Sequence, residues 1–103
     1  MSDDYVFKLY YLIIELMNSY YDKNKNEFNK YIGIIDNIIM DNNIDIDIKE
    51  IVNSYGLSSD EMVEYYLEGY TNSSIQNNVD KALLYKRLYN YVVVLNNGIN
   101  KMR

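Results

Sequence analysis

The chain has 103 residues, the size of one ordinary domain, and its ten Lys and Arg against fifteen Asp and Glu give a formal charge of -5. It contains no cysteine, histidine, proline or tryptophan, so disulfides, thiolate metal sites, cysteine nucleophiles and histidine-dependent triads are excluded within it. Apolar residues make up 49% and charged residues 24%, the balance of a globular protein, and we expect residues 1–103 to form a single helical domain.

The N-terminal segment lacks the pattern of a secretion signal or a membrane span. It opens with the acidic pair Asp3 and Asp4, where a secretion signal would be basic. The apolar stretch that follows is interrupted by Lys8 and Glu15, and it is shorter than the roughly 20 apolar residues that cross a bilayer. We therefore expect a soluble, cytoplasmic protein without a membrane partner.

The first helix is predicted to run from Asp3 or Asp4 to about Tyr21, with the acids at its positive N-terminus. Its polar residues recur every seven positions, at Lys8, Glu15 and Asp22, and leave most of its circumference apolar. Such a helix must be buried on several sides, so it is either the central helix of the domain or half of a dimer interface. For a homodimer, the predicted contact residues are Tyr10, Ile14, Met17 and Tyr21.

The second helix is predicted from about Glu27 to Met40, after a polar break at residues 22–26. Its apolar residues are spaced by three and four, which predicts one buried face: Phe28, Tyr31, Ile32, Ile35, Ile38 and Ile39. Residues 44–48 alternate isoleucine with aspartate, the period of a strand, but no partner strand exists and we interpret them as an extended connector. Asp47 would then cap a third helix from Ile48 to Tyr55, closed by Gly56.

The fourth helix is predicted to start at Ser58, with Glu61 completing a capping box, and to end at Glu68 before Gly69. Residues 71–74 would form a polar loop, followed by a last helix from about Ser74 to Asn96. Residues 92–94 are three valines, which would also suit a short strand. The buried side of the last helix is predicted from its spacing: Ile75, Val79, Leu83, Leu84, Leu88, Val92 and Leu95. The fold class is thus an all-α bundle of about five helices.

One segment partly matches a calcium-binding loop. Asp41, Asn43, Asp45 and Asp47 occupy the first four ligand positions, but the sixth position requires glycine and the twelfth a bidentate glutamate. Ile46 and Val52 stand there instead. No metal site and no cofactor are therefore predicted.

Acidic residues recur along the fourth predicted helix. Asp60, Glu64 and Glu68 are spaced by four, with Glu61 beside them, and neither a histidine nor a phosphate-binding glycine loop accompanies them. The pattern fits a solvated helix face or a ridge that binds a partner, and catalysis is the least supported of the alternatives. The residues predicted to bind a partner are Asp60, Glu61, Glu64, Tyr65 and Glu68.

Residues 48–69 also have the pattern of a helix-turn-helix pair, with Gly56 in the turn and Ser58 at the start of the second helix. The second helix carries four acids and no base, which would repel the DNA backbone. If the pair forms, we expect it to bind protein or to be structural. A DNA-binding regulator would have to dock through the bases near the C-terminus, namely Lys81, Lys86, Arg87, Lys101 and Arg103.

Thirteen tyrosines, several of them in adjacent pairs, complete the pattern. Neighbours on a helix point about 100° apart, so both rings of a pair cannot face one core, and some must reach the surface or a partner. We expect a small, acidic, non-catalytic protein that binds a basic partner protein and forms a homodimer. An inhibitor, an immunity protein or an antitoxin fits this expectation, including a phage-encoded protein that blocks a CRISPR-type or other nucleic-acid-handling enzyme. The alternative is a helix-turn-helix regulator of transcription or of a plasmid.

Overall fold

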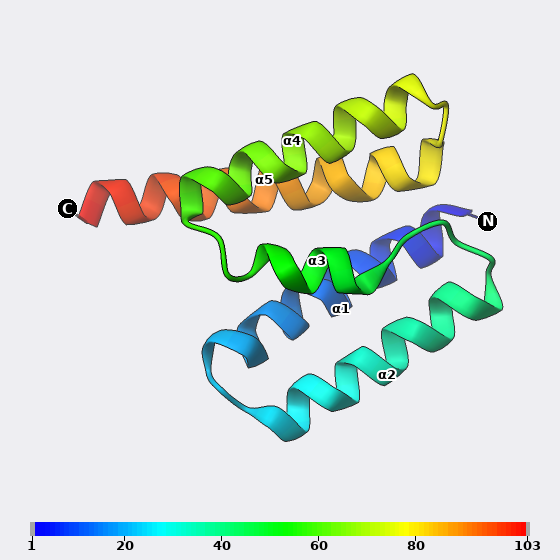
Figure 1. Ribbon diagram of the computed structural model, residues 1–103, viewed down its shortest axis with the longest axis horizontal. Coiled ribbons are helices and arrows are strands. Elements are labelled where there is room, and N and C mark those ends of the chain that lie inside the picture. Colours follow the sequence, from blue (N-terminus) through cyan, green and yellow to red (C-terminus); the bar gives the residue numbers. More distant parts are fainter. Residues whose placement is uncertain (1, 103) are drawn as a thin grey trace. The chain divides into compact units, whose positions relative to one another are not determined.

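The computed structural model describes residues 2–102, with side chains described for residues 5–98. This part of the chain contains five helices and no strand (Figure 1). The prediction of an all-α fold of five helices is confirmed. The helices are α1 (Ser2–Tyr21), α2 (Lys25–Asp41), α3 (Ile48–Ser54), α4 (Ser59–Ile75) and α5 (Val79–Met102).

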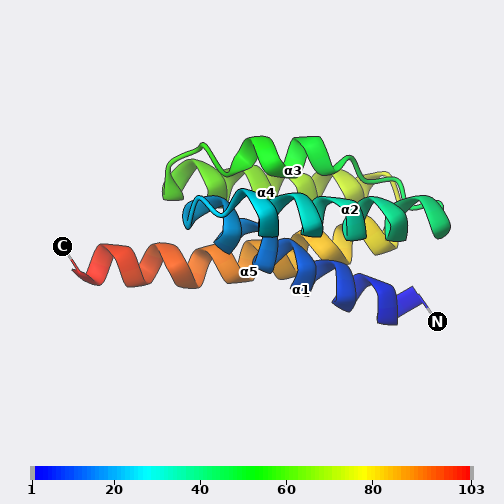
Figure 2. The ribbon, with the colours of Figure 1, turned by 90° about the horizontal axis from the view of Figure 1, so that it is seen from below.

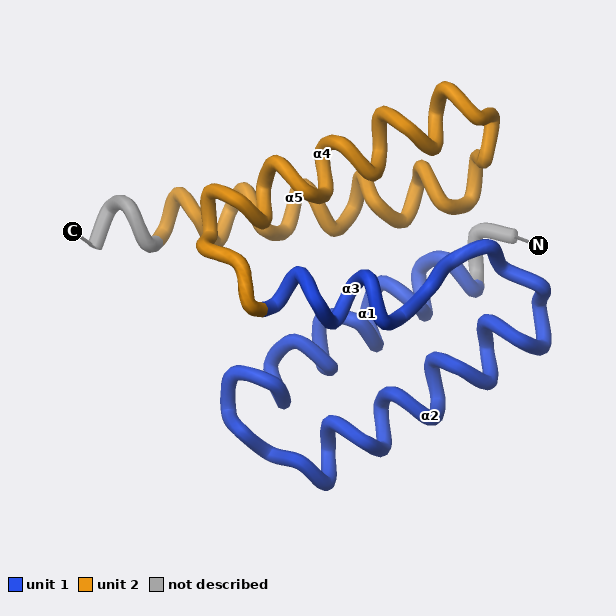
Figure 3. Tube along the Cα trace, in the orientation of Figure 1, with its two compact units in different colours: residues 1–55 blue, residues 56–103 orange. Residues whose placement is uncertain are grey.

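Contacts within the chain define two compact units, residues 1–55 with α1, α2 and α3, and residues 56–103 with α4 and α5 (Figure 3). The boundary falls between Tyr55 and Gly56. The single domain over residues 1–103 stays a prediction.

In the first unit, α1 and α2 run antiparallel and α3 contacts α2 (Figure 1 and Figure 2). Aromatic residues join the end of α1 to the end of α3: the ring centroids of Tyr20 and Tyr55 are 5.5 Å apart. The buried Tyr55 hydroxyl donates to the carbonyl of Ile13 at 3.1 Å, and the Tyr21 hydroxyl donates to the carbonyl of Tyr55 at 3.2 Å. The buried apolar residues of this unit are Val6, Leu9, Ile13, Leu16, Met17, Ile35, Ile46, Ile48, Ile51 and Tyr55.

α2 and α3 each begin at a polar side chain that accepts a hydrogen bond from a backbone N–H group left unpaired in the first turn. Asn24 accepts from the backbone nitrogen of Glu27 at 3.2 Å, so α2 begins two residues before the predicted Glu27. Asp47 accepts from the nitrogen of Lys49 at 2.9 Å, which confirms the predicted cap of α3.

In the second unit, α4 and α5 form an antiparallel helical hairpin and lie side by side in both views (Figure 1 and Figure 2). The rings of Tyr66 and Tyr85 pack in its core with their centroids 5.9 Å apart. Val92 is buried within α5, and all three valines at 92–94 are helical, so the alternative of a short strand is wrong. The other buried apolar residues here are Met62, Ala82, Leu84 and Leu88.

The predicted boundary between the last two helices is wrong. Gly69 does not end α4 but lies inside it, where a Cβ atom would come within 2.8 Å of Cδ1 of Tyr85, so the glycine permits close packing of α5. The break comes at residues 76–78, where Asn77 adopts a left-handed conformation (φ 59°) and the Asn78 side chain accepts from the nitrogen of Lys81. Ile75 and Val79 flank this turn with 75% and 73% of their surfaces exposed, so their predicted place in the core is also wrong.

Two serine substitutions test these helix boundaries. Ser58→Ala should lower the free energy of unfolding by about 1 kcal/mol, because the Ser58 hydroxyl accepts from the nitrogen of Glu61 at the start of α4. Ser74→Ala is the matched control: Ser74 lies exposed inside α4, where alanine is the better helix former and should be neutral or slightly stabilising. Urea denaturation measures both, and an equal loss at Ser74 would contradict the observed boundary.

Candidate functional site

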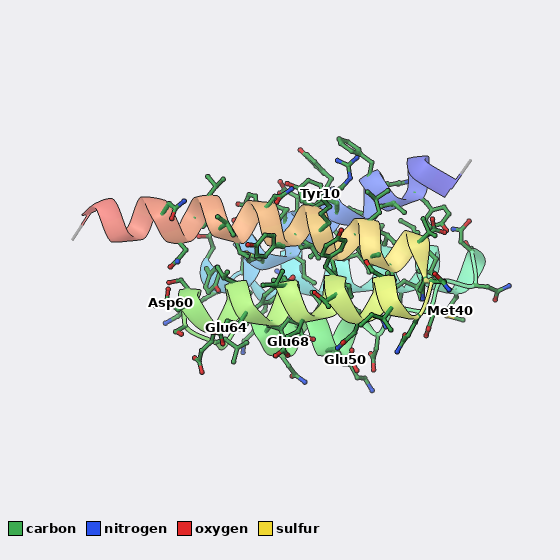
Figure 4. The ribbon with its side chains drawn as sticks, turned by 90° about the horizontal axis from the view of Figure 1, so that it is seen from above. Tyr10, Met40, Glu50, Asp60, Glu64 and Glu68 are labelled. Atoms are coloured by element: carbon green, nitrogen blue, oxygen red, sulfur yellow. The ribbon has the colours of Figure 1, made fainter. Side chains whose placement is uncertain are left out.

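The acids of α4 form one exposed surface. Asp60, Glu64 and Glu68, which we call the acidic face, follow one another along α4 with their side chains directed away from α5 (Figure 4). Residues 59–75 contain four acids and no Lys or Arg, and no described side chain forms an ion pair with the acidic face. The three carboxylates are therefore open to a partner.

Glu61, predicted as part of the same surface, has a local role as well. Its Oε1 accepts from the backbone nitrogen of Ser58 at 3.0 Å, and this hydrogen bond lowers the pKa of the fully exposed Glu61 carboxyl. The carboxylate form is therefore favoured in the folded chain, and the cap weakens as pH falls through the lowered pKa of Glu61. Glu61 thus helps to start α4, and it is not counted as part of the acidic face.

Tyr65 and Leu67 lie on α4 at the borders of the acidic face. The half-buried Tyr65 ring meets the buried Tyr66 ring edge to face, with centroids 5.2 Å apart. Leu67 has 43% of its surface exposed and follows Glu64 by three residues, which places it beside the acids. Leu67 is not among the residues predicted to bind a partner, although the helical spacing that joins Glu64 to Glu68 also includes it.

The predicted dimer residues of α1 differ in exposure. Tyr10 and Ile14 are half-buried and Tyr21 is exposed. Met17 is buried, so its assignment to a dimer interface is wrong. Phe7 and Tyr11, one turn apart on α1, are the largely exposed aromatic residues that the prediction left out. Whether a second copy binds here stays a prediction.

The bases proposed for DNA binding lie on α5. Lys86 Nζ stands 5.9 Å from the centroid of the Tyr70 ring, Arg87 is exposed, and Lys81 is half-buried. The side chains of Lys101 and Arg103 lie outside the described residues.

The predicted helix-turn-helix pair spans the boundary between the units. α3 belongs to the first unit and α4 to the second, and the helix against which α4 packs within its own unit is α5. The pairing of α3 with α4 stays a prediction.

Two further observations concern ligands and membranes. Among the described residues, no three acidic side chains come close enough together to hold a metal ion. Nor does any helix in that part of the chain combine the length and apolar character needed to cross a membrane.

No family model, no curated protein and no solved structure matches the chain.

Proposed function

We propose that this protein is a small non-catalytic binding module that attaches to a basic surface of a partner protein through the acidic face of α4. The observation that carries the proposal is the row of Asp60, Glu64 and Glu68, exposed and without a counter-charge on their own helix. The proposal does not depend on Glu61, whose carboxylate serves the helix start.

The geometry of the row suits a basic groove. Successive carboxylates are four residues apart, so at about 1.5 Å per residue they repeat every 6 Å or so along α4. Like charges at this spacing repel one another by a few tenths of a kcal/mol in the free helix, and cations of a partner would relieve that repulsion. Exposed Leu67 adds an apolar contact beside the charges.

The placement of the acids supports binding over catalysis. Catalytic carboxylates are typically gathered in a concave pocket where burial sets their pKa values apart. Asp60, Glu64 and Glu68 instead follow the outer, exposed side of one helix. A helix with evenly spaced carboxylates resembles a phosphate backbone in charge, which suits a blocker of a nucleic-acid-handling enzyme, including a CRISPR-type one, and equally an immunity protein or an antitoxin.

Charge reversal with a photo-crosslinker tests the proposal. A benzoylphenylalanine at Leu67, beside the acidic face, should cross-link one partner protein in nuclease-treated lysate of the source cells. The same group at Val94, an exposed position on α5, should not. Adding Asp60→Lys, Glu64→Lys and Glu68→Lys should reduce the Leu67 cross-link about tenfold or more, because opposite charges then become like charges.

The matched control reverses three exposed acids of the first unit, Asp22, Asp41 and Asp45, for the same change in net charge. It should leave the cross-link and the helical content near those of the wild type. Equal loss in both triple variants, or equal cross-linking from Leu67 and Val94, would contradict the proposal.

The second candidate is a DNA-binding regulator, favoured by the exposed bases Lys86 and Arg87 on α5. Binding to duplex DNA would then weaken steeply with salt, because each phosphate contact releases counterions. Lys86→Glu together with Arg87→Glu would abolish it, whereas the reversal of the acidic face would strengthen it.

A further inference from the structure

An open groove runs along α2 in the first unit. One cavity of about 410 Å³ lies at the turn between α1 and α2, and a second of about 390 Å³ lies between α2 and α3. Phe28 and Asn29 line both cavities, so the two lie next to each other along α2. Their size is within the range of about 300–1,000 Å³ that is usual for ligand sites.

The floor of this groove is apolar. Tyr20 and Phe28 pack with their ring centroids 6.3 Å apart in the first cavity, and half-buried Ile32 and Val52 continue the apolar surface in the second. Phe28 lines both cavities. Two apolar side chains of an extended ligand, two residues apart and so on the same face, could therefore each occupy one cavity.

The rim of the groove is basic, although the whole chain has a net charge of -5. Lys23 and Lys25 line the first cavity and Lys49 lines the second, all three exposed and none in an ion pair with a described side chain. Asp36 is the one acid among the lining residues that the structure describes.

Amide side chains lie between these charges. Asn29 is exposed at the junction of the two cavities and Asn53 is exposed at the α3 side. An asparagine amide both donates and accepts hydrogen bonds, as the main chain of a bound peptide requires. The basic ends, the apolar floor and the exposed amides are together the features of a peptide-binding groove.

We propose that this groove binds a short acidic peptide segment of a partner protein, with large apolar side chains of the segment in the two cavities. The positions on α2 that line it run from Lys25 to Asp36, about 16 Å at 1.5 Å per residue, the length of about five residues of extended chain. The segment alternates Asp or Glu with apolar residues, so that its carboxylates meet the lysines. This site differs from the acidic face in unit and in charge, and it stands without the function proposed above.

Nuclear magnetic resonance on the full ¹⁵N-labelled chain tests the proposal. The probes are pentapeptides in which Asp or Glu at positions one, three and five alternates with Leu, Ile, Phe or Tyr. Saturable shifts should appear at the amides of Phe28, Asn29 and Asn53. Pentapeptides with lysine in place of every acid should bind about tenfold or more weakly.

Two double variants with equal changes in net charge separate the groove from general electrostatics. Lys23→Glu with Lys25→Glu should weaken binding of the acidic peptides about tenfold or more. Lys8→Glu with Lys86→Glu changes two exposed lysines, on α1 and α5, that line neither cavity, and binding should stay within about twofold of the wild type. Thermal unfolding establishes that both variants are folded.

Three results would overturn the proposal. One is the absence of groove shifts with every acidic peptide, and another is an equal loss of binding in both double variants. The third is a concentration-dependent shift of the same amides without peptide, which would show that a second copy of the chain occupies the groove.

Discussion

Replacing Gly69 with alanine is expected to lower the free energy of unfolding by about 1–3 kcal/mol, as overpacking of a core typically does. The added Cβ would lie 2.8 Å from Cδ1 of Tyr85 and 3.0 Å from Cγ of the same ring. Since Cγ is the fixed end of the ring and Tyr85 is buried against Tyr66, the ring cannot turn away and the helices must separate. This loss should exceed the gain of about 1 kcal/mol that alanine brings to a helix interior.

Gly33→Ala provides the matched control. Gly33 is exposed inside α2 and has no atom within 4 Å of its added Cβ, so only the gain in helix propensity should remain. The free energy of unfolding should rise by about 0.5–1 kcal/mol. Urea denaturation of the two variants should therefore give opposite signs, and a gain at both positions would contradict the close packing of Gly69 on Tyr85.

Replacing Tyr55 with alanine is expected to lower the free energy of unfolding by about 3–5 kcal/mol, the range for truncating a large buried aromatic side chain. Tyr55 is almost fully buried and packs against the rings of Tyr20 and Tyr21, so truncation leaves a cavity at the end of α3. Tyr55→Phe keeps the ring and removes the hydrogen bond to the Ile13 carbonyl, for a loss of about 1 kcal/mol.

Tyr11→Phe is the control for the hydroxyl, because Tyr11 is exposed on α1. Its effect on the free energy of unfolding should stay within about 0.5 kcal/mol. Thermal and urea unfolding of the three variants separate the ring of Tyr55 from its hydroxyl. If Tyr55→Phe were as neutral as Tyr11→Phe, the bond to Ile13 would contribute nothing to stability.

The helix starts could be predicted from sequence because a cap is a local interaction. Asp47 and Ser58 act on backbone groups two and three residues away, and both caps are confirmed. The end of α4 could not be predicted, because the role of Gly69 depends on Tyr85, a residue 16 positions further along the chain. Read alone, a glycine shortly before the polar residues 71–74 indicates a helix end, and only the packing of α5 shows that Gly69 is an interior contact.

The candidate sites show the same limit. The acidic face follows from the spacing of Asp60, Glu64 and Glu68 on one helix, and its exposure was expected from charge alone. The groove along α2 was not predicted, because its lining residues come from the end of α1, the turn, α2 and α3, and no local pattern joins them. Met17 was misplaced because an apolar pattern all round a helix does not tell which side the rest of the chain covers.

Residues other than glycine hold the left-handed positions beside the ends of α1, α2 and α4: Lys23 (φ 58°), Asn43 (φ 51°) and Asn77 (φ 59°). Glycine would adopt this conformation without the steric penalty of a side chain. Asparagine tolerates the left-handed conformation, so the exchange would gain least at Asn43 and Asn77 and most at Lys23. At residue 23 the same exchange would remove an ammonium group from the rim of the groove. Selection for heat resistance alone would therefore favour losing this lysine, whereas selection for capture of an acidic ligand would retain it.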